Sequence, residues 1–249
     1  MKRDLSRRSR DQLVVLLTLP TGAVDAACFL HLGHVFSSVV TGTMVLLGVA
    51  AGSRDSGLAI HCAVALASYT SGVVIGAPIA GRSSGQRPAG ATGPRDIWPQ
   101  AVTVALAAEF CILAAFCVGW ELRGGRPHGS SQLVLLALVA VSMGIQAAAV
   151  RQLGEMSTTY LTGTLTGIVA VLATRQKPEG LARSLGVFAA LIVGAVISAT
   201  VAAYAPGWLP LVVLLPLAVV LALSATRSRS GAFTPRRRGR LSPGGLGGP

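Results

Sequence analysis

The sequence has few residues that could do chemistry, and two of them occupy equivalent places in a repeated segment. Residues 25–43 align without a gap to residues 146–164, and seven of the nineteen aligned positions are identical. Asp25 opens the first copy and Gln146 opens the second. A carboxylate and a neutral amide that converge from two repeats would suit a site coupled to a proton or another cation. In the structural alternative, Asp25 caps a broken helix or pairs with Arg151.

A second acidic residue, Glu109, lies near the centre of another apolar stretch. Because an unpaired charge is costly at the bilayer centre, such an acid is protonated, paired with another span, or exposed to a cavity. Of the basic residues in the sequence, Arg151 is the one that lies well within an apolar stretch. It is therefore a candidate ion-pair partner for Glu109. The sequence therefore leaves Glu109 as either a site residue or a member of a structural ion pair.

Both copies of the repeated segment end in the motif Thr-Gly-Thr. Glycine releases the backbone from helical geometry, and threonine hydroxyls can bond the freed carbonyl groups or face a ligand. The motif therefore predicts the backbone of a substrate site, with close helix packing through small residues as the alternative. Its members are Thr41, Gly42, Thr43, Thr162, Gly163 and Thr164.

Motifs of enzymes and metal sites are missing from the sequence. It contains no Gly-x-Ser-x-Gly, His-Glu-x-x-His or phosphate-binding loop. His31 and His34 are three residues apart, but Gln152 and Glu155 take their places in the second copy, which favours polar residues at the membrane interface over metal ligands. We therefore expect no enzyme, no catalytic residue, no metal and no cofactor.

The composition is that of an integral membrane protein. Hydrophobic residues make up 52% of the chain and charged residues 12%, and the mean hydropathy is +0.65. The net charge is +12, yet eleven of the 21 basic residues lie in the two terminal tails, where they act as topology signals and contacts to anionic lipid. We expect the lipid bilayer and anionic lipids as partners and no nucleic acid, while homo-oligomer formation stays open.

The apolar stretches allow two topologies. A full crossing needs about 20 apolar residues, and the second and sixth stretches, which hold the Thr-Gly-Thr motifs, are the shortest. If every stretch crosses, the halves are parallel repeats. If the two short ones are re-entrant, six full spans form inverted repeats and the basic loop 81–97 becomes cytoplasmic, which fits the charges better. The eight stretches are about 12–33, 37–52, 57–80, 98–120, 132–153, 157–174, 181–204 and 208–225.

The predicted fold is therefore an all-α polytopic membrane protein with six full spans, up to eight apolar segments, and two homologous inverted repeats with broken helices. We place it in the bacterial cytoplasmic membrane with both termini cytoplasmic. The expected parts are a basic tail at 1–10, a first repeat at 11–120, a second repeat at 131–225, and a disordered basic tail at 226–249.

Several motifs resemble the YoaK-like family of bacterial membrane proteins of unknown function, and the resemblance covers residues 11–225. It implies about six spans in the cytoplasmic membrane and names no substrate. Thr43 departs from the family pattern, which more often reads Thr-Gly-Asn. The motifs that carry the resemblance lie at residues 22–33, 41–43 and 46–48 in the first half and at 143–151 and 158–166 in the second.

Two classes of function remain. The first is a transporter or channel-like protein for an unidentified small solute or ion, with its site between the two repeats. The second is a membrane sensor or scaffold that does not transport and whose basic tails bind lipid or a partner. Broken repeats with intramembrane acids favour the first class.

Overall fold

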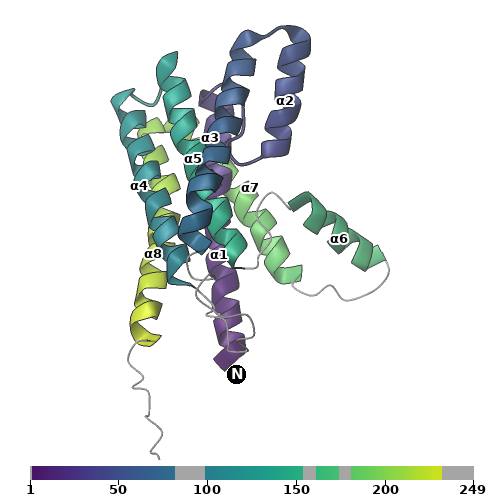
Figure 1. Cartoon of the computed structure of the whole chain (residues 1–249), viewed down its shortest axis with the longest axis vertical. Helices are drawn as coiled ribbons and strands as arrows, with labels where there is room; N and C mark the ends of the chain where they lie inside the picture. The colour runs from purple at the N-terminus through teal and green to yellow at the C-terminus, as the bar shows by residue number, and fades with distance from the viewer. Residues whose placement is uncertain (1, 82–98, 154–160, 174–180, 232–249) are drawn as a thin grey trace, which may run out of the picture.

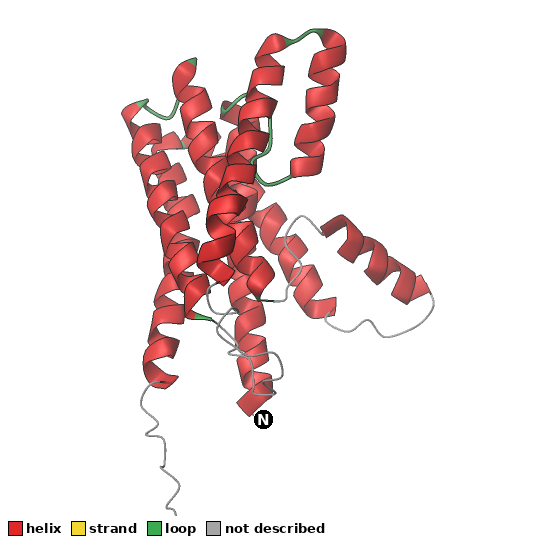
Figure 2. Ribbon diagram, in the orientation of Figure 1, coloured by secondary structure: helices red, strands yellow, loops and turns green. Residues whose placement is uncertain are grey.

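The computed structural model describes residues 2–81, 99–153, 161–173 and 181–231, and every regular element in these ranges is a helix (Figures 1 and 2). The chain is thus all-helical in the described part, as predicted. The elements are α1 (Lys2–His31), α2 (Val40–Ser53), α3 (Ser56–Gly81), α4 (Gln100–Leu122), α5 (Ser130–Gln152), α6 (Leu161–Ala173), α7 (Leu181–Tyr204), the short 3-10 helix η2 (Pro206–Trp208) and α8 (Leu209–Gly231).

Six of the described helices are long and apolar enough to cross a membrane, namely α1, α3, α4, α5, α7 and α8. Their apolar parts contain 21 to 26 residues, and at a rise of about 1.5 Å per residue they match a hydrocarbon core of about 30 Å. Helix α2 has 14 residues and α6 has 13, so neither can cross alone. The expectation of a polytopic protein with six full spans is confirmed.

Corresponding spans of the two halves run in opposite directions. In Figure 1, α1 runs upward from the N-terminus whereas α5 runs downward, α3 runs downward whereas α7 runs upward, and α4 runs upward whereas α8 runs downward. Two inverted halves require this arrangement of directions. The homology of the halves stays a prediction from the sequence.

The two halves pack through one helix pair each: a helix of the first half lies along a helix of the second half in both pairs. Helix α3 packs along α5, and α7 packs along α1. Between α3 and α5 the backbones touch at glycines: a Cβ added at Gly72 would lie 2.1 Å from the carbonyl oxygen of Val141, and one at Gly144 would lie 2.2 Å from that of Tyr69. Small residues allow this close approach of helices within a membrane.

The second exchanged pair, α1 and α7, is built in the same way. A Cβ at Gly22 would lie 2.1 Å from the carbonyl oxygen of Leu191, and one at Gly194 would lie 2.1 Å from that of Leu19. Helix α4 then packs on α5, α8 packs on α1, and α4 and α8 contact each other. These contacts bring α1, α4 and α5 together around the interior of the bundle.

The helix ends differ in places from the predicted boundaries. Helix α1 already begins at Lys2, within the segment predicted as a basic tail. Helix α8 ends at Gly231, beyond the boundary at residue 226 from which disorder was expected. The residues between Thr226 and Gly231 contain neither proline nor an earlier glycine that would stop the helix. Residues 232–249 and the loop 82–98 lie outside the described part.

Candidate intramembrane polar site

Asp25 holds a non-helical turn against the first span. Its Oδ1 accepts hydrogen bonds from the backbone N–H of Ser37 and of Ser38, both at 2.9 Å, and from the Ser37 hydroxyl at 2.8 Å. The Ser38 hydroxyl donates to Oδ2. Asp25, Ser37 and Ser38 are all buried. We call these three residues the Asp25 anchor.

The anchor explains how the chain can break its helix here. Residues 32–39 leave α1 and lead into α2, so their backbone groups need partners other than a helical ladder. Thr43 adds one such partner, since its hydroxyl donates to the carbonyl oxygen of Phe36 at 2.9 Å. Asp25 supplies another by accepting two backbone N–H groups. The capping alternative for Asp25 therefore has direct geometric support.

A second polar cluster joins the two halves. The amide nitrogen Nε2 of Gln146 lies 2.8 Å from Oε1 of Glu109, and the amide oxygen Oε1 of Gln146 lies 2.9 Å from Oγ1 of Thr21. Thr21 and Glu109 are 0% exposed and Gln146 is 5% exposed. We call these three residues the Glu109 chain. It links α4, α5 and α1, and Glu109 lies near the middle of α4.

One oxygen of this cluster stands out. Glu109 Oε2 is buried and has no hydrogen-bond partner among the described residues. An ionised carboxylate would place part of its charge on this oxygen in an apolar interior, which is costly. A neutral carboxylic acid leaves only a carbonyl-like oxygen unpaired there. The free-energy cost of burying Glu109 therefore depends on whether its carboxyl group is ionised or neutral.

Asp25 and Gln146, whose convergence the sequence predicts, have different hydrogen-bond partners. The hydrogen bonds of Gln146 go to Thr21 and Glu109, while those of Asp25 go to Ser37 and Ser38. Thr21 precedes Asp25 by one helical turn, so both side chains lie on the same face of α1. The Asp25 anchor and the Glu109 chain are therefore neighbours along one helix face.

Among the described residues, Arg151 forms no ion pair with Asp25 or Glu109, as either alternative would require. Arg151 is exposed at the C-terminal end of α5, whereas Glu109 and Asp25 are buried and bonded to neutral groups. Arg151 is close to Gln146 in the sequence of α5, but it is five residues further on. The two side chains therefore do not lie on the same face of the helix.

The Thr-Gly-Thr motifs do not join the Glu109 chain among the described side chains. In the first copy, Thr41 is exposed and Gly42 is half-buried, while Thr43 braces the turn. In the second copy, Gly163 lies on α6 with no atom within 4 Å of where its Cβ would be. The side chains of Thr162 and Thr164 lie outside the described part.

The comparisons with known proteins agree with this architecture. The family described as "Protein of unknown function (DUF1275)" matches residues 13–224. The chain belongs to this family. It is also similar to the UPF0700 transmembrane protein YoaK of Bacillus subtilis (strain 168), with 32% identity over 225 residues that cover 87% of this chain and 93% of that protein. No solved structure matches.

Membership of the family confirms the resemblance read from the paired motifs, but its description assigns no chemistry. The candidate chemistry thus comes from the geometry of the site itself. The Glu109 chain can gain or lose a proton at a carboxyl group, and it can exchange hydrogen-bond donors and acceptors through an amide and a hydroxyl. The described residues hold no group of three His, Cys, Asp or Glu side chains that could bind a metal.

Sequence reasoning missed Thr21 as a member of this DUF1275 protein's site. A signal was available, because Thr21 lies four residues before Asp25 and therefore on the same helix face. Ser37 and Ser38 were visible as hydroxyl positions that recur as Thr158 and Thr159 in the repeat. Their bonds to Asp25 depend on the path of the turn, which the sequence pattern does not specify.

Proposed function

We propose that this protein moves a small solute or an ion across the membrane through a site between its two halves. The observation that carries the proposal is the buried Glu109 carboxyl, which is hydrogen-bonded to Gln146 where three spans meet. Ionisable residues inside membrane spans are rare and costly, and they are kept chiefly on substrate pathways, ion pathways and proton relays.

The non-helical segment between α1 and α2 supports the same proposal. Residues 32–39 form non-helical backbone next to a short helix, and such backbone in membrane proteins is found where it is buried in protein or lines a cavity. Many secondary transporters combine inverted halves, interrupted helices and polar groups near the middle of the membrane. The Asp25 anchor would then set the position of α2 relative to the site.

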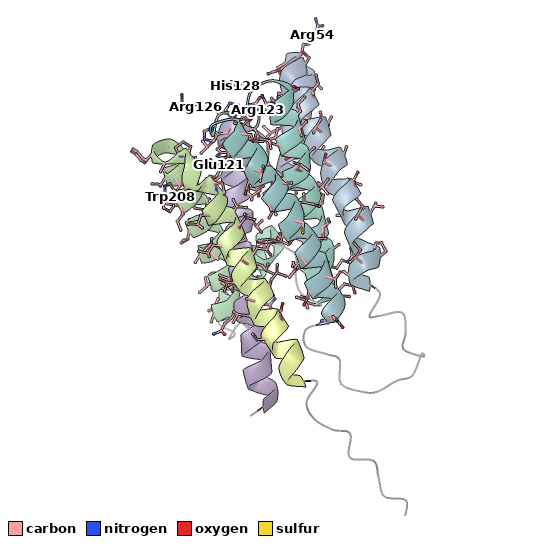
Figure 3. All side chains as sticks on the ribbon, turned by 90° about the vertical axis from the view of Figure 1, so that its left-hand side faces the viewer. Arg54, Glu121, Arg123, Arg126, His128 and Trp208 are labelled. Atoms are coloured by element: carbon pink, nitrogen blue, oxygen red, sulfur yellow. The ribbon has the colours of Figure 1, made fainter. Side chains whose placement is uncertain are left out.

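We further propose that the end of the bundle with the N-terminus of α1 faces the cytoplasm of a bacterium and that the membrane is its inner membrane. Figure 3 labels Arg54, Arg123 and Arg126 at the opposite end. These are three of the 21 Lys and Arg residues, whereas eleven lie in the two tails. Arg151 and Arg183 lie close to the ends of α5 and α7 that are on the same side as the N-terminus. The excess of basic residues in cytoplasmic loops supports this orientation.

Uptake measurements would test the transport proposal. Cells with and without the protein would be exposed to a broad panel of labelled solutes and ions, and the cell contents compared. We expect at least one compound whose flux depends on the protein and falls in Glu109→Gln. The matched control is Glu121→Gln, since Glu121 is an exposed acid at the end of the same helix. If no flux changes across the panel, the sensor or scaffold class is favoured.

A further inference from the structure

The hydroxyl of Thr21 has two acceptors and one proton to give. Its Oγ1 lies 3.1 Å from the carbonyl oxygen of Leu17 and 2.9 Å from Oε1 of Gln146. A hydroxyl donates one hydrogen bond but can also accept, so both contacts are satisfied together only if one of them is made as an acceptor. The backbone carbonyl of Leu17 cannot donate. The Gln146 side chain can, if its amide turns over.

Turning the Gln146 amide by half a turn exchanges its oxygen and nitrogen without moving the backbone, because the two ends are nearly equal in size. In the first orientation, Nε2 donates to an ionised Glu109, and Thr21 donates to the amide oxygen. In the second, a protonated Glu109 donates to the amide oxygen, Nε2 donates to Thr21, and Thr21 donates to Leu17. Each protonation state of Glu109 thus has its own set of donors and acceptors from Oε1 of Glu109 through Gln146 to Thr21, while Oε2 of Glu109 has no partner among the described residues in either state.

We propose that Glu109 is a proton-binding site and that proton uptake turns the side-chain amide of Gln146, which carries the change from α4 to α1. The proton comes from water and forms an O–H bond at Oε1 of Glu109, and its loss restores the carboxylate, with no electron transferred. The proposal rests on the proposed transport site, and it names the proton as the ion that this site takes up.

The surroundings leave Glu109 dependent on this amide. Helices α3, α5 and α8 pack against α4, and Gln146 is the hydrogen-bonding side chain that Glu109 has among them. In the same neighbourhood, Asp25 of α1 is held by its own serines. The titratable or charged side chains of α3, α5 and α8 are His61, Cys62, Tyr69, Arg151, Arg227 and Arg229, and those of α4 itself are Cys111, Cys117 and Glu121.

The position of Thr21 connects the proton site to the Asp25 anchor. Thr21 lies one helical turn before Asp25 on α1, and Asp25 holds the turn at residues 37 and 38. A change in the hydrogen-bond partner of Thr21 therefore occurs close to the segment that links α1 to α2. This places the proposed switch one helical turn from the anchor that holds the segment between α1 and α2.

Two spectroscopic measurements on the purified full-length protein in lipid nanodiscs test the proposal. Infrared difference spectra across a pH titration should contain the C=O stretch of a buried carboxylic acid, which should vanish in Glu109→Gln and persist in Glu121→Gln. In protein labelled with ¹⁵N-glutamine, the side-chain resonance assigned by its loss in Gln146→Leu should shift over the same titration, and it should stay fixed in Glu109→Gln.

A matched pair of threonine variants tests the link to α1. Thr21→Val removes the hydroxyl that the amide is proposed to exchange with and should reduce the pH-dependent shift of the Gln146 resonance. Thr18→Val should leave that shift unchanged, because the buried Thr18 hydroxyl donates to the carbonyl oxygen of Val14 within its own helix and has no other hydrogen-bond partner among the described residues. This comparison also decides the matter if Glu109→Gln does not fold.

Three results would overturn the proposal: a carboxyl band that does not depend on Glu109, a Gln146 resonance that does not respond to pH, or equal effects of the two threonine variants. None of these measurements needs a transported solute. A failure here therefore leaves the transport proposal standing, and a protein that transports nothing can still show the titration.

Discussion

The side-chain amide of Gln146 donates to the carboxyl group of Glu109 across 2.8 Å, and this bond joins α5 to α4 inside the bundle. The other end of the same amide contacts Thr21 of α1. Gln146 therefore has both of its polar ends engaged, in each case by a residue of the first half. A single neutral side chain from the second half holds two spans of the first half in register.

Replacing Gln146 with leucine should destabilise the protein. Glu109 would lose its hydrogen-bond partner among the described residues, and both of its oxygens would then be buried without a donor. Leaving a buried charged or polar group unpaired costs about 1–3 kcal/mol. We expect a lower midpoint of thermal or denaturant unfolding in detergent.

A double-mutant cycle with Glu109→Leu separates this bond from general packing effects. If the two residues act through their hydrogen bond, the double variant should lose less stability than the sum of the single variants. Strict additivity of the two single effects would mean that the contact contributes nothing to folding.

Asp25→Leu should release the turn that follows α1. The substitution removes the acceptor of four hydrogen bonds from Ser37 and Ser38. Cys28, which is 0% exposed and lies on α1 less than one turn beyond Asp25, should then react with a thiol reagent, as mass spectrometry of the labelled peptide would reveal.

Asp55→Leu is the matched control for this experiment. Asp55 also accepts a backbone N–H, that of Leu58, but it does so at an exposed turn between α2 and α3. Its loss should leave Cys28 protected. Equal protection of Cys28 in both variants would argue against an anchoring role for Asp25.

Leucine at Gly72 or Gly194 should disrupt the exchanged helix pairs. Each glycine lies against a backbone carbonyl of the partner helix, so any side chain there must push two spans apart. We expect lower yield and a lower unfolding temperature in detergent for both variants. Gly48→Leu is the control, because no atom lies within 4 Å of where its Cβ would be. An equal loss in the control would assign the effect to helix propensity or handling.

The sequence was sufficient for the architecture because the architecture depends on patterns along the chain. Span length and apolar content identified the six membrane helices and the short segments. The repeated segment picked out Asp25 and Gln146 as equivalent positions.

The hydrogen-bond partners within the site depend on how three helices pack together. The spacing of residues along the sequence does not predict them. Gln146 bonds Glu109 and Thr21 because α5 packs on α4 and approaches α1, whereas the sequence suggested a direct approach to Asp25. The partner suggested for Glu109, Arg151, was chosen by charge, yet in the structure one oxygen of the acid accepts a hydrogen bond from a neutral amide. Both differences arise because tertiary contacts decide which of several polar residues meet.

Topology reporters should separate the two schemes left open by the apolar stretches. Fusions after residues 5, 90 and 235 should all read cytoplasmic, and a fusion after residue 127 should read periplasmic. The reason is that α3 ends and α4 begins at the same end of the bundle as the N-terminus, while the connection between α4 and α5 lies at the other end (Figure 1). Among the residues that the structure describes, the Lys and Arg residues of α1 lie on the first of these two sides.

The fusion after residue 90 is the decisive one. With six spans, two crossings by α1 and α3 return the chain to its starting side before residue 82. If α2 also crossed, three crossings would place residue 90 in the periplasm. A periplasmic reading there, with the fusions after residues 5 and 235 still cytoplasmic, would therefore require α2 and α6 to cross fully. Helix α2, at 14 residues, would then have to cross about 30 Å of hydrocarbon with a length of only about 21 Å.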